Sequence, residues 1–131
     1  MNPETMDKSL RGTLADLLGI RFVDTSGDRV VAELTIRDDL RTVGGALHGG
    51  TLMAFADTVV AAAAIVNLPA GATTTTLESK TNFFAAGRGG MVRAESTPLH
   101  RGKRTMVWQT RVTDDAGRLL SLTIQTQMVL T

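Results

Sequence analysis

The longest apolar segment of the chain, residues 51–66, contains a single charged residue, Asp57. Two glycines precede it and Pro69 follows it, so the segment predicts a helix that begins near Gly49 and ends before that proline. The segment is shorter than the ~20 apolar residues of a membrane span. We therefore interpret it as the core helix of a soluble domain.

β-branched residues between short turns predict strands on both sides of this helix. The first two strands are separated by turn residues 25–28 and predict a hairpin, and the turn lengths of the last three predict an antiparallel meander. Leucines at helical spacing predict one short helix from Pro3 through Leu18, ended by Gly19. The predicted strands are residues 20–24, 29–36, 73–84, 90–99, 104–113 and 118–130.

One long apolar helix and about six strands indicate an α+β domain, residues 1–131, in which a curved sheet wraps the helix. The helix is apolar on nearly all faces, which is more than one sheet can cover. We therefore expect a partner subunit on its other side. The apolar residues of the last strand are candidates for such an interface.

Composition narrows the function classes. The 131 residues are 43% hydrophobic and 21% charged, which fits one soluble domain, and the net charge of +1 favours neither nucleic acid nor an anionic membrane. Without cysteine, and with two histidines, we expect no disulfide, thiol nucleophile or metal site. Residues 1–12 lack the apolar core of a signal peptide, so we expect a cytoplasmic protein.

Two features suggest chemistry. Asp57 is a carboxylate on a largely buried helix, which indicates a wet cleft or a reactive group; the alternative is a polar partner for a threonine. His48-Gly49-Gly50 opens the helix, where unsatisfied N–H groups can bind a developing negative charge, although two glycines can also simply form a tight turn. Asp57 lies about 13 Å along the axis from His48, so a shared site requires two chains.

These residues are similar to a known family. The segment 44–50 (GGALHGG), Asp57 and the alanine-rich helix resemble the hotdog-fold acyl-CoA thioesterases of the phenylacetate-degradation type, relatives of the 4-hydroxybenzoyl-CoA thioesterases. Residues 82–84, 100–104 and 114–118 are also similar to the family pattern. The resemblance covers most of the chain and implies a hotdog fold and a homodimer that assembles into a homotetramer.

The resemblance also implies residue roles. Asp57 matches the acidic nucleophile or general base, and Gly49 matches the backbone donor that polarises the thioester carbonyl. His48 matches a histidine that orients or polarises the thioester, and Thr76 roughly matches a hydroxyl that positions water. Thr42 is a departure, because the family often has Asn or Gln there and a hydroxyl cannot form the same paired hydrogen bonds.

CoA is the expected ligand, as part of the substrate, and neither a metal nor a cofactor is required. Basic side chains could contact its phosphates, and glycines leave backbone N–H groups accessible, although a solvated basic turn is an equal alternative for any one residue. The candidate substrate and CoA residues are Gly50, Thr42, Arg88, Arg101, Gly102, Lys103 and Arg104.

The preferred function is hydrolysis of an aryl- or medium-chain acyl-CoA. The alternative is a noncatalytic acyl-CoA-binding or regulatory hotdog protein, in which Thr42 reflects a weakened site. A hotdog dehydratase is a weaker third possibility, because the usual histidine-containing hydration motif is absent. Neither alternative changes the predicted fold.

Overall fold

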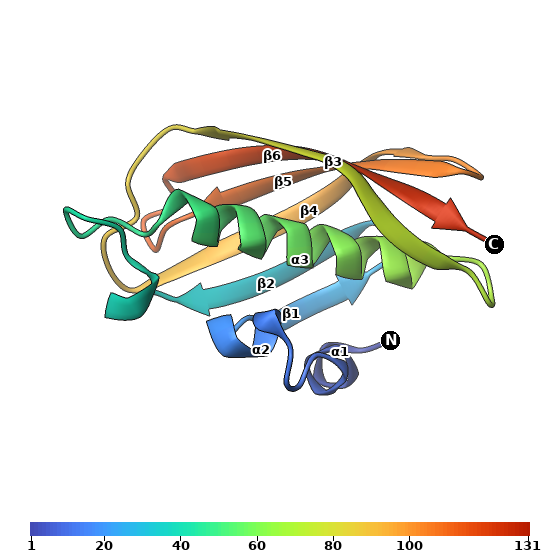
Figure 1. Cartoon of the computed structure of the whole chain (residues 1–131), viewed down its shortest axis with the longest axis horizontal. Coiled ribbons are helices and arrows are strands. Elements are labelled where there is room, and N and C mark those ends of the chain that lie inside the picture. The colour runs from blue at the N-terminus through green and yellow to red at the C-terminus, as the bar shows by residue number, and fades with distance from the viewer.

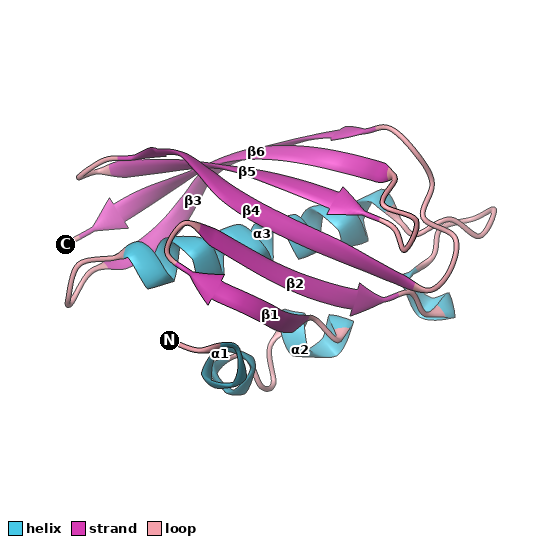
Figure 2. Cartoon of the chain, turned by 180° about the vertical axis from the view of Figure 1, so that it is seen from behind, coloured by secondary structure: helices cyan, strands magenta, loops and turns pink.

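The computed structural model describes all 131 residues, and at its centre α3 (Gly49–Asn67) lies across one face of a six-stranded sheet (Figure 1). The strand order is β1-β2-β4-β5-β6-β3, with every neighbouring pair antiparallel. Seen from behind, the strands curve over the helix (Figure 2). This confirms the predicted α+β hotdog arrangement and the meander of the last three strands. The strands are β1 (Arg21–Ser26), β2 (Arg29–Thr35), β3 (Thr73–Phe83), β4 (Met91–Arg101), β5 (Thr105–Thr113) and β6 (Leu119–Leu130).

α3 is buried on one side only. Phe55, Val59 and Ala63 are fully buried, and the helix contacts all six strands. The opposite side exposes Met53 and Ile65. With 19 residues α3 is longer than the apolar segment 51–66, and its length and composition fit a membrane span, a test that core helices of soluble proteins pass as well. The sheet thus covers α3 as predicted, while a partner on the open side stays a prediction.

The two edges of the sheet differ. Along β1, α1 (Pro3–Ser9) covers the edge, and the Phe22 N–H donates a hydrogen bond to Asp7 Oδ1 at 2.9 Å. Along β3, no strand pairs with the outer edge, and most residues of the strand are exposed. An unpaired edge of this length is a template for pairing with another chain.

The prediction of one N-terminal helix through Leu18 is wrong. The segment forms α1 and a separate short helix, α2 (Leu14–Leu18), because Gly12 adopts the left-handed conformation with φ +79° and breaks the helical path. Gly19 ends α2 as predicted, also in the left-handed conformation. A further short 3-10 helix, η1 (Asp38–Leu40), lies in the predicted loop before α3.

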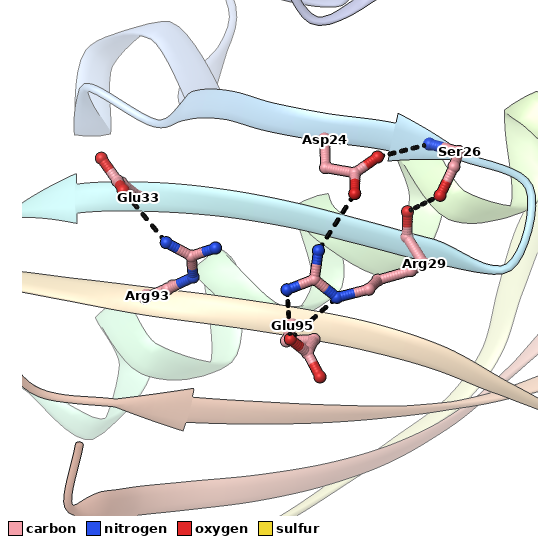
Figure 3. A network of polar contacts seen from close by, with 6 residues as sticks. All are labelled: Asp24, Ser26, Arg29, Glu33, Arg93 and Glu95. Carbon is pink, nitrogen blue, oxygen red and sulfur yellow. Dashed lines mark hydrogen bonds and ion pairs between the residues drawn. The ribbon is translucent and has the colours of Figure 1, made fainter.

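Ion pairs tie the first part of the sheet together on the face away from α3 (Figure 3). Arg29 of β2 lies 3.0 Å from Asp24 of β1 and 2.7 Å from Glu95 of β4. Glu33 of β2 and Arg93 of β4 form a second contact at 3.6 Å. Three neighbouring strands are thus joined by side chains as well as by backbone hydrogen bonds.

Candidate active site

Asp57 lies on the open side of α3, beside β3 and β6. Gln125 Nε2 donates a hydrogen bond to Asp57 Oδ1 at 2.7 Å, and Thr76 Oγ1 lies 3.2 Å from the same oxygen. Asp57 Oδ2 accepts no hydrogen bond from the chain. The carboxylate is therefore fixed through one oxygen, and the other is free to act on a bound molecule. The structure brings together Asp57 and Thr76, two of the predicted site residues.

A buried amide network holds the Asp57 carboxylate from behind. Gln125 Nε2 also donates to Gln127 Oε1 at 2.8 Å, and Gln127 Nε2 donates to Thr74 Oγ1 at 3.1 Å. Thr76 Oγ1 donates to Gln127 Oε1 at 2.7 Å. Turning the Gln125 amide over would place its oxygen against two other oxygens, so its NH₂ group must face Asp57. Sequence analysis selected neither Gln125 nor Gln127.

The start of α3 presents two hydrogen-bond donors. His48 is the N-cap residue, and its Nδ1 accepts from the Gly50 N–H at 2.7 Å. A neutral His48 ring with Nδ1 as acceptor carries its proton on Nε2. The Gly49 N–H has no partner in the chain and lies at the positive end of the helix. Gly49 and His48 can therefore donate to a ligand, whereas the Gly50 N–H is already occupied.

These donors are distant from Asp57 within one chain. Gly49 and Asp57 are separated by eight residues of α3, which is about 12 Å along the helix axis. One thioester group cannot contact both in a single subunit. The separation agrees with the spacing argument from the sequence, and a site built from two chains stays a prediction.

The candidate CoA residues fall into two groups at opposite ends of α3. Arg88 lies beside the loop before the helix and donates to the Gly44 carbonyl at 3.1 Å. Arg101 lies at the far end, where it pairs with Asp28 at 2.9 Å and donates to Asn67 Oδ1 at 3.2 Å. The 19 residues of α3 separate the groups by about 28 Å.

The other candidate CoA-binding residues differ in whether they already form hydrogen bonds or ion pairs within the chain. Lys103 and Arg104 are exposed and form no ion pair, so both side chains are available for an anion. The Gly102 N–H is used within the turn, where it donates to the Thr105 carbonyl at 2.9 Å. Thr42 is exposed and its hydroxyl has no partner; its N–H donates to the Ala46 carbonyl at 2.8 Å and closes the loop.

A cavity of about 490 Å³ opens next to Asp57, between the N-terminal helices and α3. Asp57 is the one charged side chain in its lining, and most of the other lining residues are hydrophobic. A carboxylate at the edge of an apolar cavity can meet the polar end of an otherwise apolar molecule.

Comparison with known proteins agrees with this geometry. A family model described as Thioesterase superfamily matches residues 44–121. The 1,4-dihydroxy-2-naphthoyl-CoA hydrolase of Escherichia coli K12 is 29% identical over 116 residues, which cover 88% of this chain and 85% of that protein. The crystal structure of thioesterase HI1161 from Haemophilus influenzae has a TM-score of 0.96 and 25% identity, covering 100% of this chain and 92% of the other.

The PaaI protein of the E. coli phenylacetic acid degradation operon shares the fold, with a TM-score of 0.88 and 20% identity over 97% of this chain and 91% of its own. The family match includes the start of α3, Asp57 and Thr76. The chain therefore belongs to the thioesterase superfamily, with the hotdog fold that the sequence predicted, and is a hydrolase of thioesters.

Proposed function

We propose that the chain hydrolyses the thioester of an aryl- or medium-chain acyl-CoA to the free acid and CoA. The observation that carries this proposal is the Asp57 carboxylate, fixed through Oδ1 and free at Oδ2, on the open side of α3. The name of the E. coli relative, a naphthoyl-CoA hydrolase, supports a CoA thioester as the substrate.

Asp57 has two possible roles. As a general base it takes a proton from water, whose oxygen attacks the thioester carbonyl carbon. As a nucleophile its oxygen attacks that carbon itself, and water then hydrolyses the resulting anhydride. In both routes the C–S bond breaks and the CoA sulfur leaves and takes up a proton. Gly49 N–H and His48 Nε2–H stabilise the negative charge on the carbonyl oxygen.

The proposed site combines Asp57 of one subunit with Gly49 and His48 of another, in a homodimer that assembles further into a homotetramer. Three observations support this: the separation of about 12 Å between Asp57 and Gly49, the unpaired β3 edge, and the exposed Met53 and Ile65 on α3. Lys103 and Arg104, which form no ion pair, are the best available contacts for the CoA phosphates. The enzyme needs no cofactor, and we expect it in the cytoplasm.

The test is release of free thiol from phenylacetyl-, benzoyl-, hexanoyl- and decanoyl-CoA by the wild type and by Asp57→Asn. We expect Asp57→Asn to lower kcat/KM by about 100- to 10,000-fold, because it loses the base or nucleophile but keeps the shape of the side chain. CoA binding should be retained.

Glu4→Gln is the matched control, since Glu4 is an exposed carboxylate of α1 outside the proposed site, and its only ion pair is with the exposed Lys8. It should retain wild-type turnover. Full activity of Asp57→Asn would remove Asp57 from the mechanism. Wild-type protein that binds these compounds without releasing thiol would instead favour the noncatalytic binding function.

A further inference from the structure

The cavity beside Asp57 is built by two parts of the chain that are distant in sequence. One wall is the N-terminal segment with Met6, Leu10 and Leu14; the other is α3 with Ala61 and Ile65. Of its 12 lining residues, 8 are hydrophobic. Its volume of about 490 Å³ lies within the range of pockets that hold small ligands.

The hydroxyl groups in the lining do not make this cavity polar. Ser9, Thr13 and Thr58 each donate to a backbone carbonyl three or four residues earlier in the chain, at 2.7, 2.5 and 2.8 Å. Their hydrogen atoms are therefore directed to the backbone and not to a ligand. Asp57 remains as the charged group that a bound molecule would meet.

The lining residues of α3 show that the cavity is elongated along the helix axis. Asp57, Ala61 and Ile65 follow one another at intervals of one helical turn and extend over about 12 Å along the axis. Asp57 is at one end of this row. An elongated apolar occupant would thus have its reacting group at Asp57 and its tail toward Ile65.

The residue types favour a flexible aliphatic occupant. No Phe or Trp lines the cavity, so a flat aromatic acyl group would have no ring to stack against. Met1 and Met6 have unbranched, adaptable side chains that fit chains of varying shape.

The N-terminal wall is anchored to the rest of the domain. Asp7 of α1 accepts the Phe22 N–H at 2.9 Å, and Thr25 Oγ1 donates to the Met1 carbonyl at 2.6 Å. Arg37 donates to the carbonyls at the end of α2, at 3.0 and 3.2 Å. These contacts hold both ends of the segment, so the cavity is formed before a ligand binds.

We propose that this cavity holds the straight-chain acyl group of the substrate, with octanoyl to decanoyl as the preferred length and the thioester carbonyl at Asp57. This inference rests on the proposed thioesterase function and adds its acyl specificity. Ala61 and Leu10 lie on opposite walls of the cavity, so a larger side chain at either position would shorten the chain that fits.

The test compares kcat/KM for butanoyl-, hexanoyl-, octanoyl-, decanoyl- and benzoyl-CoA in the wild type and in Ala61→Phe. Each buried methylene should raise wild-type kcat/KM by about three- to fourfold, up to octanoyl or decanoyl. Phe at position 61 fills the middle of the cavity. It should lower the ratio of octanoyl- to butanoyl-CoA hydrolysis by about 10-fold or more, because only the longer chain reaches past position 61.

Leu10→Phe narrows the cavity from the other wall and should shorten the preferred chain in the same way. Ala116→Phe, in the exposed β5–β6 turn, is the matched control and should leave the chain-length profile unchanged. The third measurement needs no variant: in a crystal structure of the wild type with S-octyl-CoA, a thioether that cannot be hydrolysed, the alkyl chain should contact Ala61 and Leu10.

An alkyl chain bound elsewhere would overturn the inference, as would folded Ala61→Phe and Leu10→Phe variants that keep the wild-type ratio of octanoyl to butanoyl turnover. Benzoyl-CoA as the best substrate, unaffected by either variant, would also overturn it. In all these cases the proposed hydrolysis would stand. Wild-type protein that cleaves none of the thioesters would overturn the proposed function itself.

Discussion

Gln125 is the residue whose role the structure defines most sharply. It is fully buried, and its NH₂ group lies between Asp57 Oδ1 and Gln127 Oε1, while its own Oε1 has no partner. A buried polar atom without a partner is unfavourable by about 1–3 kcal/mol. This arrangement is understandable if the amide serves to orient Asp57.

We predict that Gln125→Leu lowers kcat by about 10- to 100-fold, because Asp57 loses the donor that fixes its orientation. The free energy of unfolding should change by less than about 1.5 kcal/mol, since the variant also removes the unpaired oxygen. Steady-state kinetics and urea denaturation measure the two effects. Gln109→Leu, on the opposite face of the sheet, is the control, and a stability loss without a kcat effect would make Gln125 merely structural.

Asp57 could be predicted from the sequence because it is the one charged residue in an apolar helix. Gln125 could not, because it is one of several polar residues in β6. In β6 polar and apolar residues alternate, and alternation alone does not say which face turns toward α3. The structure turns Thr123, Gln125 and Gln127 inward, although sequence reasoning had attended to the apolar set. Only the pairing of β6 with β3 brings the glutamines to Asp57.

Among the elements, strands β1, β2 and β4 are stabilised in part by the ion pairs of Arg29 with Asp24 and Glu95. The pKa of Asp24 is lowered, chiefly by the backbone N–H of Ser26 and further by the Arg29 guanidinium. The pKa of Arg29 is raised, chiefly by its hydrogen bond to Glu95. A lowered carboxyl pKa adds stability above the pKa of the unfolded chain, and this is lost as pH falls through the folded value.

We predict that Asp24→Asn is less stable than the wild type above about pH 4, by up to about 1 kcal/mol because the pair is partly exposed. The difference should disappear in stronger acid, where Asp24 of the wild type is also protonated. Urea denaturation at pH 7 and at a series of lower pH values measures it. Asp38→Asn, at a fully exposed side chain, is the control. A difference that persists in acid would contradict the electrostatic explanation.

The sequence predicts a helix or strand correctly where its hydrophobic pattern is long, as in α3. It does not do so for the short helices α1 and α2. The hydrophobic run of α3 and the turn residues between strands define their elements without tertiary information. The N-terminal leucines fit one continuous helix equally well, and the conformation of Gly12 decides between one helix and two. The spacing of the leucines carries no information on that conformation, so it could not predict the break.

At the scale of the whole molecule, the proposed active site requires a second copy of the chain. A variant that removes the Gly49 N–H can test this. Gly49→Pro is suited to it, because Gly49 is the first residue of α3, where proline is well accepted, and its N–H has no partner. His48 has φ −61° and ψ 134°, which is compatible with a following proline. The new Cβ lies 3.3 Å from the half-exposed Phe83 ring, which has room to shift.

We predict that Gly49→Pro folds normally and loses about 100- to 1,000-fold in kcat, the usual effect of losing one donor to the carbonyl oxygen. It should complement Asp57→Asn when the two inactive proteins are unfolded, mixed equally and refolded together. Half of the dimers then contain one chain of each kind, and each has one intact site that combines Asp57 of one chain with Gly49 of the other. Activity should recover to about one quarter of the wild-type level. No recovery, from mixtures shown by mass spectrometry to contain both chains in one dimer, would mean that each site uses the residues of a single subunit.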